Sequence, residues 1–392
     1  MTRLEKLIQQ FCPDGVAYKS IKQCTCKAES IKWGMDSKEY QYIDLSSVDR
    51  ETKRITDTQT ITANNAPSRA QQIIKADDIL LGTTRPMLKR YCLVNKQYDG
   101  QICSTGFCVL RTNGIVLSGW LYHQIASNDF FNYVERNQKG ASYPSISDAS
   151  VKDYCIPVPP LEVQQEIVRI LDQFTQLTAE LTAELTARKQ QYRYYRDQLL
   201  ASKRDTPVCK MGDVLTFLNG RAYKQSELLR KGKYPVLRVG NFYTNDSWYY
   251  SDLELPEDKY CNKGDLLYSW AATLGPQIWD GGKCIFHYHI WKVLFDSDSI
   301  DREYLYYYLQ YDLELISRST TKSTMVHVSM ESMKKRLIPL PPIQEQKRIA
   351  SLIGKFDALC NDLTSGLPAE IGARQKQYEY YRDKLLTFKE KA

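Results

Sequence analysis

The sequence predicts an α+β protein in which two mixed α/β domains alternate with two long helical segments, related by pseudo-twofold symmetry. Three observations support this fold class. The chain has 392 residues, too many for one ordinary core, and 43% of them are hydrophobic. The stretch QYRYYRDQLL at 191–200 returns as QYEYYRDKLL at 377–386. Short apolar runs broken by turn residues fill the regions between, as in sheets.

The repeat extends beyond the tyrosines and divides the chain. IPVPPLEVQQEI at 156–167 matches IPLPPIQEQKRI at 338–349, 182 residues later, whereas the tyrosine stretches are 186 apart. The second copy has therefore gained four residues. Because this period is much longer than that of solenoid repeats, a whole domain and its connector are duplicated. We expect a first domain, a first helical spacer, a second domain and a second spacer, at 1–155, 156–205, 206–337 and 338–392.

Each spacer is predicted to be one long helix beginning at or just after its proline pair. Proline is excluded from helix interiors, so the first helix starts no earlier than Pro160. Apolar residues then recur at steps of three and four as far as Leu199, the pattern of a coiled-coil seam about 60 Å long. Gly366 and Pro368 lie in the extra turn of the second copy and should kink or break that helix.

Both domains show similar patterns but little sequence identity. Strands are predicted at 79–81, 107–110, 234–239 and 290–295, and an amphipathic helix follows in each domain near 119–135 and 301–315. An acidic residue enters a strand in both copies, at Asp78 and Asp265. One fold with two diverged surfaces indicates two related domains that bind different targets.

Composition narrows the functional class. The formal charge of +7 permits nucleic acid without requiring it, and the 28 tyrosines suit wet interfaces. No secretory signal or membrane-spanning run is found, so we expect a cytoplasmic protein. Eleven dispersed cysteines predict reduced, mostly buried thiols. His287 and His289 point to one face of a probable strand and could ligate a metal, but no carboxylate or Cys cluster accompanies them. We expect no metal, cofactor or catalytic residue.

Two alternatives to nucleic-acid recognition remain open. Glu257 and Lys259 have the Glu-x-Lys spacing of metal-dependent nucleases, in which carboxylates hold Mg²⁺ and lysine helps to activate water. A solvated loop explains this triplet more simply, because it occurs in only one repeat, next to Pro256. The other alternative is a coiled-coil scaffold with no role in DNA binding.

Basic and hydroxyl-rich loops occur in both domains and are the candidate DNA contacts. Basic side chains contact phosphates, and Arg, Asn or Gln read base edges. The candidates are Arg50, Lys53, Arg54, Arg69, Arg85, Lys89, Arg90, Lys139, Ser142 and Tyr143 in the first domain, and Arg221, Tyr223, Lys224, Lys231, Lys233, Arg238, Asn241, Tyr243, Thr320, Thr321, Lys322 and Ser323 in the second.

Taken together, these motifs resemble the specificity subunit of a type I restriction-modification system. The likeness covers nearly the whole chain and includes the Ile-Pro-x-Pro-Pro entries with downstream Gln164 and Gln346, and the Arg-x-x-Gln-Tyr-x-Tyr-Tyr-Arg-Asp-x-Leu-Leu ends from Arg188 and Arg374. The first helix departs from the family pattern at 178–185, where Thr-Ala-Glu-Leu occurs twice in tandem. Similar repeats in some family members vary in number and change the spacing that is recognised.

The resemblance implies a non-catalytic subunit. Each target recognition domain would read one half of an asymmetric, bipartite site in double-stranded DNA, and the two helices would form an antiparallel coiled coil that fixes the gap. Two methylation subunits would dock on this frame, and restriction subunits would join later; these partners would supply catalysis, S-adenosylmethionine and ATP. In the tyrosine stretch, Tyr192, Tyr195 and Leu199 are expected on the seam. The expected outward-facing, partner-binding residues are Arg193, Tyr194, Arg196, Asp197, Tyr380, Arg382 and Asp383.

Overall fold

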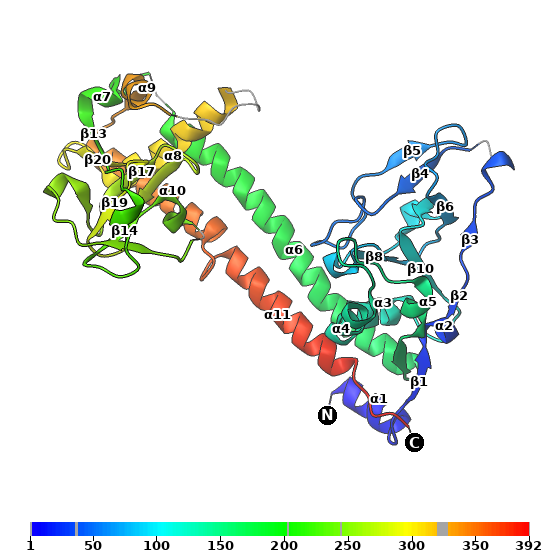
Figure 1. Ribbon diagram of the computed structural model, residues 1–392. Helices are drawn as coiled ribbons and strands as arrows, with labels where there is room; N and C mark the ends of the chain where they lie inside the picture. Colours follow the sequence, from blue (N-terminus) through cyan, green and yellow to red (C-terminus); the bar gives the residue numbers. More distant parts are fainter. Residues whose placement is uncertain (1, 36–37, 202–203, 244, 320–327, 392) are drawn as a thin grey trace. The chain divides into compact units, whose positions relative to one another are not determined.

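The chain folds as two compact units of mixed helix and sheet. The computed structural model describes residues 2–35, 38–201, 204–243, 245–319 and 328–391 (Figure 1). The first unit consists of residues 1–183 and 370–392, and the second of residues 184–369. The predicted α+β class is confirmed. Because each unit contains a domain together with helical residues from both spacers, the four-part division at 155, 205 and 337 remains a prediction.

The first unit contains three sheets. A two-stranded sheet pairs β1 (Ala17–Ser20) with β11 (Cys155–Val158). A four-stranded sheet has the order β2 (Thr25–Cys26), β10 (Phe107–Thr112), β7 (Ile79–Gly82), β8 (Tyr91–Leu93). A five-stranded sheet has the order β3 (Glu29–Ser30), β6 (Ala70–Ile73), β9 (Ile102–Ser104), β4 (Tyr40–Ile43), β5 (Gln59–Ile61). The helices are α1 (Arg3–Phe11), α2 (Ile21–Cys24), α3 (Ser118–Ala126), α4 (Asn128–Asn137) and α5 (Asp148–Asp153).

The second unit repeats much of this plan. β12 (Val208–Lys210) pairs with β21 (Leu337–Pro339), and a four-stranded sheet has the order β13 (Leu215–Asn219), β20 (Ile290–Phe295), β17 (Leu266–Ser269), β18 (Gly275–Ile278). The other sheet has four strands, in the order β15 (Tyr249–Ser251), β14 (Tyr234–Leu237), β19 (Cys284–Phe286), β16 (Tyr260–Cys261). Its helices are α7 (Met211–Val214), α8 (Arg302–Ser319), α9 (Met330–Lys335) and α10 (Ile343–Asn361).

The predicted strands are confirmed, except that β14 ends at Leu237, so Arg238 and Val239 lie outside the strand predicted at 234–239. The acidic residue that precedes β7 or β17 has a structural role in both units. Asp78 is buried before β7, where it accepts hydrogen bonds from Arg111 of β10 at 2.9 and 2.7 Å. Asp265 lies before β17 and pairs with Lys292 of β20 at 2.6 Å. A buried carboxylate needs such a partner, because an unpaired charge costs several kcal/mol to bury. The repeated acid therefore fixes neighbouring strands.

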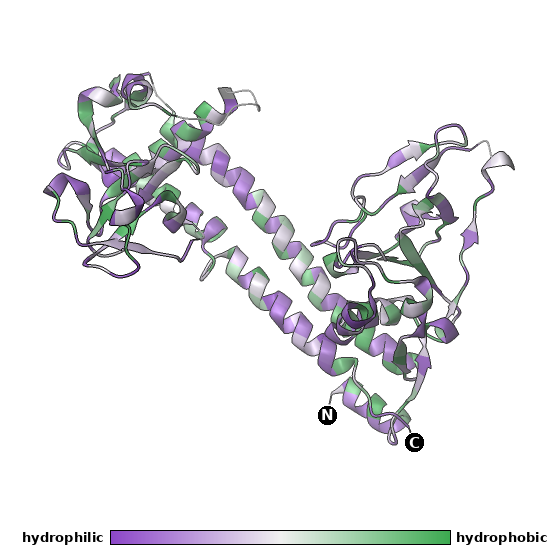
Figure 2. Ribbon diagram, viewed as in Figure 1, coloured by the Kyte–Doolittle hydropathy of each residue, from purple (hydrophilic) through white to green (hydrophobic). Residues whose placement is uncertain are grey.

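The long helices begin and end where the sequence predicts. α6 spans Leu161–Leu200, directly after Pro160, and α10 begins directly after Pro342. The second spacer is broken: α10 ends at Asn361, and α11 spans Leu367–Leu385. Figure 2 shows hydrophilic and hydrophobic bands alternating along α6. The prediction of a single helix near 119–135 is wrong in detail, because Ser127 ends α3 and caps α4.

A buried glutamine holds each helix start to its domain in the same way. Gln164 accepts a hydrogen bond from the N–H of Leu117 at 2.9 Å and donates to the carbonyl of Pro159 at 2.7 Å. Gln346 accepts from the N–H of Asp301 at 2.9 Å and donates to the carbonyl of Pro341 at 2.8 Å. These motif glutamines therefore satisfy backbone groups that burial would otherwise leave unpaired.

An aromatic side chain reinforces each of these joints. The indole N–H of Trp120 donates to the carbonyl of Pro157 at 3.1 Å, and the hydroxyl of Tyr304 donates to the carbonyl of Pro339 at 2.8 Å. Both side chains are buried. A donor at the end of a large apolar ring suits a site that is packed on all sides but contains one free carbonyl. The hydrogen bonds that join each long helix to its domain therefore recur in both units, even where the residue type differs. We call these two joints the frame.

Candidate nucleic-acid and partner interfaces

Two basic turns lie together on the first unit. In the turn at 49–54, the Asp49 carboxylate accepts a hydrogen bond from the N–H of Thr52 at 2.6 Å, and the N–H of Asp49 donates to the carbonyl of Arg54 at 3.0 Å. The Lys53 ammonium group donates to the carbonyl of Arg50 within this turn. It also donates to the carbonyl of Lys89, in the turn at 85–90, at 2.6 Å. Sequence positions 36 residues apart are thereby joined.

Three basic residues of these turns adopt left-handed backbone conformations. The φ angles are 55° at Lys53, 48° at Arg85 and 51° at Lys89. For residues other than glycine this region costs on the order of 1 kcal/mol each, because Cβ approaches the following carbonyl. Neighbouring contacts must offset that cost.

Aromatic rings support the three cationic groups. The Lys53 ammonium lies 4.5 Å from the centre of the Tyr91 ring, and the Lys89 ammonium lies 4.9 Å from that of Phe131. The Arg85 guanidinium lies 4.5 Å from the ring centre of Tyr143. Such cation–π contacts each contribute about 0.5–1 kcal/mol at exposed sites. They fix the positions of charges that would otherwise sample many rotamers.

The loop at 139–145 joins the same surface. The N–H of Arg85 donates to the carbonyl of Pro144 at 2.7 Å, and Lys139 and Ser145 exchange backbone hydrogen bonds at 2.8 Å. Lys139, Ser142 and Tyr143 are exposed there. We call the turns at 49–54 and 85–90, together with this loop, the first basic surface.

Two predicted contacts of the first domain lie differently. The Arg90 guanidinium donates to the carbonyl of Leu45 at 2.9 Å, so part of its hydrogen-bonding capacity is used within the fold. Arg69 precedes β6, and among the described residues no side-chain contact joins it to the first basic surface. Both remain predicted DNA contacts, but Arg90, at the end of the turn at 85–90, directs part of its guanidinium into the fold, and Arg69 lies outside the first basic surface.

Electrostatics distinguish Lys53 from an ordinary surface lysine. Burial lowers the pKa of Lys53 to about 8, and the neighbouring positive charge of Lys89 contributes in the same direction. Desolvation and a like charge both disfavour the protonated amine. The Asp49 carboxylate opposes this shift without cancelling it.

Three predicted residues of the second unit gather around a histidine. The Arg238 guanidinium lies 4.4 Å from the Tyr249 ring centre, and Arg221 lies 5.1 Å from that of Tyr223. The Tyr223 ring is 6.3 Å from the ring of His287. Burial, followed by the charges of His289 and Arg238, lowers the pKa of His287 to about 4. His287 lies in the turn between β19 and β20, not within a strand as expected, and is neutral at physiological pH.

Two of the predicted basic residues of this unit form ion pairs with glutamates. Arg221 pairs with Glu227 at 2.6 Å, and Lys233 pairs with Glu254. Lys224, whose N–H donates to Glu227, and Lys231 are exposed. Asn241 donates to the carbonyls of Asn245 and Ser247, shaping its own loop. Thr320, Thr321, Lys322 and Ser323 lie outside the described residues.

Glu257 and Lys259, the two residues of the nuclease alternative, form ion pairs with other side chains. Glu257 pairs with Lys283 at 2.9 Å, and Lys259 pairs with Asp258 at 2.9 Å and donates to the carbonyl of Asn219. Over the parts of the chain that the structure describes, no group of three or more His, Cys, Asp or Glu side chains could hold a metal ion.

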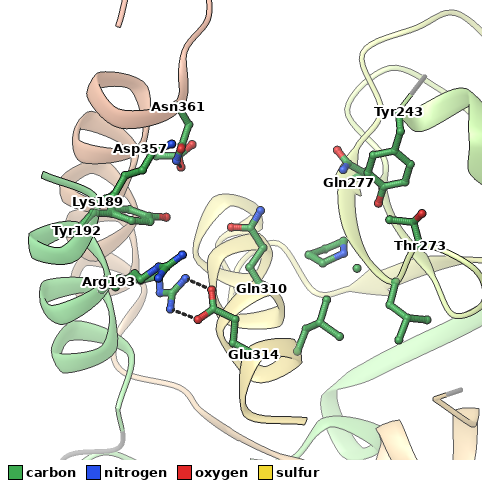
Figure 3. A pocket seen from close by; sticks show the side chains of 15 residues that line it. Lys189, Tyr192, Arg193, Tyr243, Thr273, Gln277, Gln310, Glu314, Asp357 and Asn361 are labelled. Carbon is green, nitrogen blue, oxygen red and sulfur yellow. Dashed lines mark hydrogen bonds and ion pairs between the residues drawn. The ribbon is translucent and has the colours of Figure 1, made fainter. Parts of the chain in front are cut away.

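A polar cleft of about 450 Å³ opens beside α6 in the second unit (Figure 3). Lys189 and Arg193 of α6 face Gln310 and Glu314 of α8 across it, and Tyr243 lies on the far wall. Tyr243, a predicted DNA contact, therefore lines this cleft. The sequence offered no signal for this cleft, because its walls come from five separated segments.

The repeated tyrosine stretch presents the same surface in each unit. Tyr194 is 61% exposed and Tyr380 is 63% exposed. Each meets the next tyrosine edge to face, at 5.3 Å and 75° for Tyr194 and Tyr195, and at 5.3 Å and 76° for Tyr380 and Tyr381. Exposed aromatic rings held in one geometry are typical of protein interfaces.

Two residues expected to face outward are buried. Arg196 and Arg382 are each 4% exposed, so their prediction as outer residues is wrong. Arg196 pairs with Glu314 at 2.6 Å and with Asp197 at 2.7 Å, and Arg382 pairs with Asp383 at 2.8 Å. The heptad pattern placed both arginines outside the helix pair but could not show that α8 packs against Arg196.

The residues that are buried in the tyrosine stretch also differ from those predicted for the seam. Tyr192 is buried as predicted, but Tyr195 is 45% exposed, although its ring lies 6.2 Å from that of Phe356. In the first unit, Phe174 stacks on Tyr381 at 5.5 Å. Leu200, not Leu199, is the fully buried leucine. Leu200 is buried because it packs into the hydrophobic core of the second unit.

None of the described helices combines the length and the apolarity needed to cross a bilayer. Two basic, aromatic-lined surfaces on a duplicated frame are the features expected of a protein that contacts an extended polyanion at two places.

Comparison with known proteins agrees with this class. The family model described as "Type I restriction modification DNA specificity domain" matches residues 28–188 and again 203–373. A putative type I restriction enzyme specificity subunit of Haemophilus influenzae is 33% identical over 283 residues, which cover 69% of this chain and 72% of that protein. The EcoR124I/EcoR124II specificity subunit of Escherichia coli is 36% identical over 275 residues, which cover 62% of this chain and 65% of that protein.

Solved structures share the fold. One, from work on complex assembly and conformational transition of the type I R-M system, has a TM-score of 0.67 at 24% identity and covers 95% of this chain and 98% of its own. The HsdS subunit from Thermoanaerobacter tengcongensis has a TM-score of 0.50 at 24% identity, with 96% and 97% covered. The chain belongs to the type I restriction-modification DNA specificity family and contains two copies of its domain.

Proposed function

We propose that this specificity subunit reads an asymmetric, bipartite site in double-stranded DNA, one half with each unit. The first basic surface would contact one half-site, and the cluster of Arg221, Tyr223 and Arg238 would contact the other. The observation that carries the proposal is the combination of a duplicated frame with two unlike basic surfaces. Two copies of one half-site would require like surfaces, so the difference favours an asymmetric target.

In this proposal the two spacers pair as an antiparallel coiled coil and set the gap between the half-sites. In support, α6 is continuous over 40 residues, about 60 Å at 1.5 Å per residue. The ring contacts of Phe174 with Tyr381 and of Tyr195 with Phe356 are pseudo-twofold equivalents, one in each unit. The division into recognition domains at 1–155 and 206–337 and spacers at 156–205 and 338–392 follows from this arrangement.

The repeated tyrosine stretch would dock two methylation subunits, one at each copy. Tyr194 and Tyr380 are the contacts that both copies share, and Asp197, Asp383 and Arg193 border them, whereas the buried Arg196 and Arg382 would act by holding the stretch in place. Restriction subunits would join the assembled complex. The chain itself would be non-catalytic and cytoplasmic, and S-adenosylmethionine and ATP chemistry would belong to its partners.

Reconstitution tests this function. The purified chain is incubated with duplex DNA, Mg²⁺, S-adenosylmethionine and ATP, alone and with its methylation subunit. We expect neither cleavage nor methylation from the chain alone, and methylation at one bipartite sequence from the complex. Cleavage by the single chain, lost in a variant with Glu257→Ala and Lys259→Ala, would instead establish the nuclease alternative. A complex whose methylation persists after the basic residues of both surfaces are replaced would favour the scaffold.

A further inference from the structure

The first basic surface contains an unusual concentration of backbone strain. Five non-glycine residues of the described chain have positive φ angles, and three of them are Lys53, Arg85 and Lys89. Glycine would adopt the same turns without a Cβ penalty. Cations at these positions therefore need a reason beyond turn geometry, and the exposed Arg85 and Lys89 side chains supply no buried contact that gives one.

Lys53 is placed to hold the two turns together. An ammonium group has three donors, and two of them reach the carbonyls of Arg50 and Lys89. Among the described residues no third hydrogen-bond acceptor contacts this group, which also lies over the Tyr91 ring. Because Lys89 is fixed through its own carbonyl, the direction of its side chain depends on the Lys53 contact.

The arrangement presents several cations without neutralising carboxylates. Lys89 and Arg85 form no ion pair within the described residues, and their charges lie over the Phe131 and Tyr143 rings. In the second unit, by contrast, Arg221 and Lys233 each pair with a glutamate. Unpaired cations fixed on aromatic rings suit an acceptor that brings several negative charges at regular spacing, as a DNA backbone does.

We propose that the turns at 49–54 and 85–90 form a preorganised phosphate-binding surface, in which Arg85 and Lys89 contact consecutive backbone phosphates and Lys53 is the positioning residue that locks the two turns. This inference rests on the proposed function and deepens it. The strain is present before DNA arrives, so the turns need no further ordering on binding. The first unit would hold DNA mainly by its backbone.

The test measures binding of the full chain to a labelled 30-bp duplex of mixed sequence over a series of salt concentrations. Lys89→Asn removes the charge but keeps a residue that tolerates the left-handed region. The slope of log affinity against log salt is negative, and we expect its magnitude to fall by about 0.9, which is about eightfold in affinity for each tenfold change in salt. Lys89→Arg should restore the slope. Lys96→Asn, at an exposed lysine of the same unit, changes the net charge equally and should leave the slope unaltered.

Lys53→Met keeps the aliphatic stem and removes the donors. We expect a larger fall in slope than for Lys89→Asn, because the Arg85 and Lys89 contacts would both weaken, with retained helix content by circular dichroism. If Lys53→Met does not fold, the salt dependence of Lys89→Asn still tests whether Lys89 contacts a phosphate. Unchanged slopes for Lys89→Asn and Lys53→Met, in a chain that still directs site-specific methylation, would overturn the inference but not the proposed function. Absence of DNA binding by the wild-type chain, together with absence of site-specific methylation by its complex with the methylation subunit, would overturn both.

Discussion

The two units share their frame but differ in the surfaces they present. The same hydrogen bonds join helix to domain at Gln164 and Gln346, yet the first unit exposes unpaired cations on strained turns and the second pairs Arg221 and Lys233 with glutamates. The two copies therefore share the contacts that join helix to domain and differ in their surface loops. Under the proposed function, this difference would give the two half-sites different balances of backbone and base contacts.

The largest effect is expected from the two frame glutamines. Gln164→Leu removes hydrogen bonds to the carbonyls of Ile115 and Pro159 and from the N–H of Leu117, and Gln346→Leu removes those to the carbonyls of Ser299 and Pro341 and from the N–H of Asp301. Each lost bond costs about 1 kcal/mol. We expect a loss of about 3 kcal/mol in the unfolding free energy of the unit that carries the change, measured by hydrogen exchange within that unit. Similar losses at both sites support a duplicated frame. A loss confined to one unit would show that the frames are not equivalent.

The exposed tyrosines should govern partner affinity instead of folding. Tyr194→Ala and Tyr380→Ala are each expected to cost about 2 kcal/mol in affinity for one of two methylation subunits, because exposed aromatic anchors dominate interface energies. Titration calorimetry would show one tight and one weakened site for either single variant, and two weakened sites for the double variant. Tyr→Phe changes at the same positions serve as controls and should retain most of the affinity. An equal loss at both sites from one substitution would refute separate docking.

The buried arginines offer a smaller contrast. Arg196 pairs with Glu314 and Asp197, whereas Arg382 pairs only with its neighbour Asp383 among the described ion pairs. Glu314 is 40% exposed, so solvent screens part of the interaction. We expect Arg196→Met to destabilise its unit by about 1 kcal/mol more than Arg382→Met does, in urea unfolding followed by unit-specific exchange. The reverse order would mean that packing of the arginine stem, not pairing, sets the cost.

The smallest predicted effect is a pH dependence of the first unit that has opposite signs for stability and for binding. The pKa of Lys53 is lowered to about 8 in the folded state, against an ordinary value near 10.5. Between these values the unfolded chain binds more protons, so the Lys53 contribution to stability rises with pH over pH 8 to 10.5. DNA affinity at fixed salt should fall over pH 7 to 9 as the ammonium charge is lost. Lys53→Met should flatten both trends; a wild-type affinity that stays constant over this range would contradict the assignment.

Much of the frame could be predicted from the sequence, because the repeat, the prolines and the apolar period all act locally. The start of α6 after Pro160 and the break before Leu367 followed directly from proline and glycine chemistry. The burial of Arg196 could not be predicted, because it depends on α8, more than a hundred residues later in the chain. The bridge from Lys53 to Lys89 depends on similar long-range contacts. Candidate residues were found by type, but their grouping required the fold.

The central claim is that two fixed half-site readers are separated by a helical spacer of set length. The Thr-Ala-Glu-Leu repeat at 178–185 provides the test, because one additional unit adds about 6 Å, or between one and two base pairs. Methylome sequencing of cells that carry this insertion should show both half-sites unchanged and the gap between them lengthened. Altered half-sites with an unchanged gap would contradict the account.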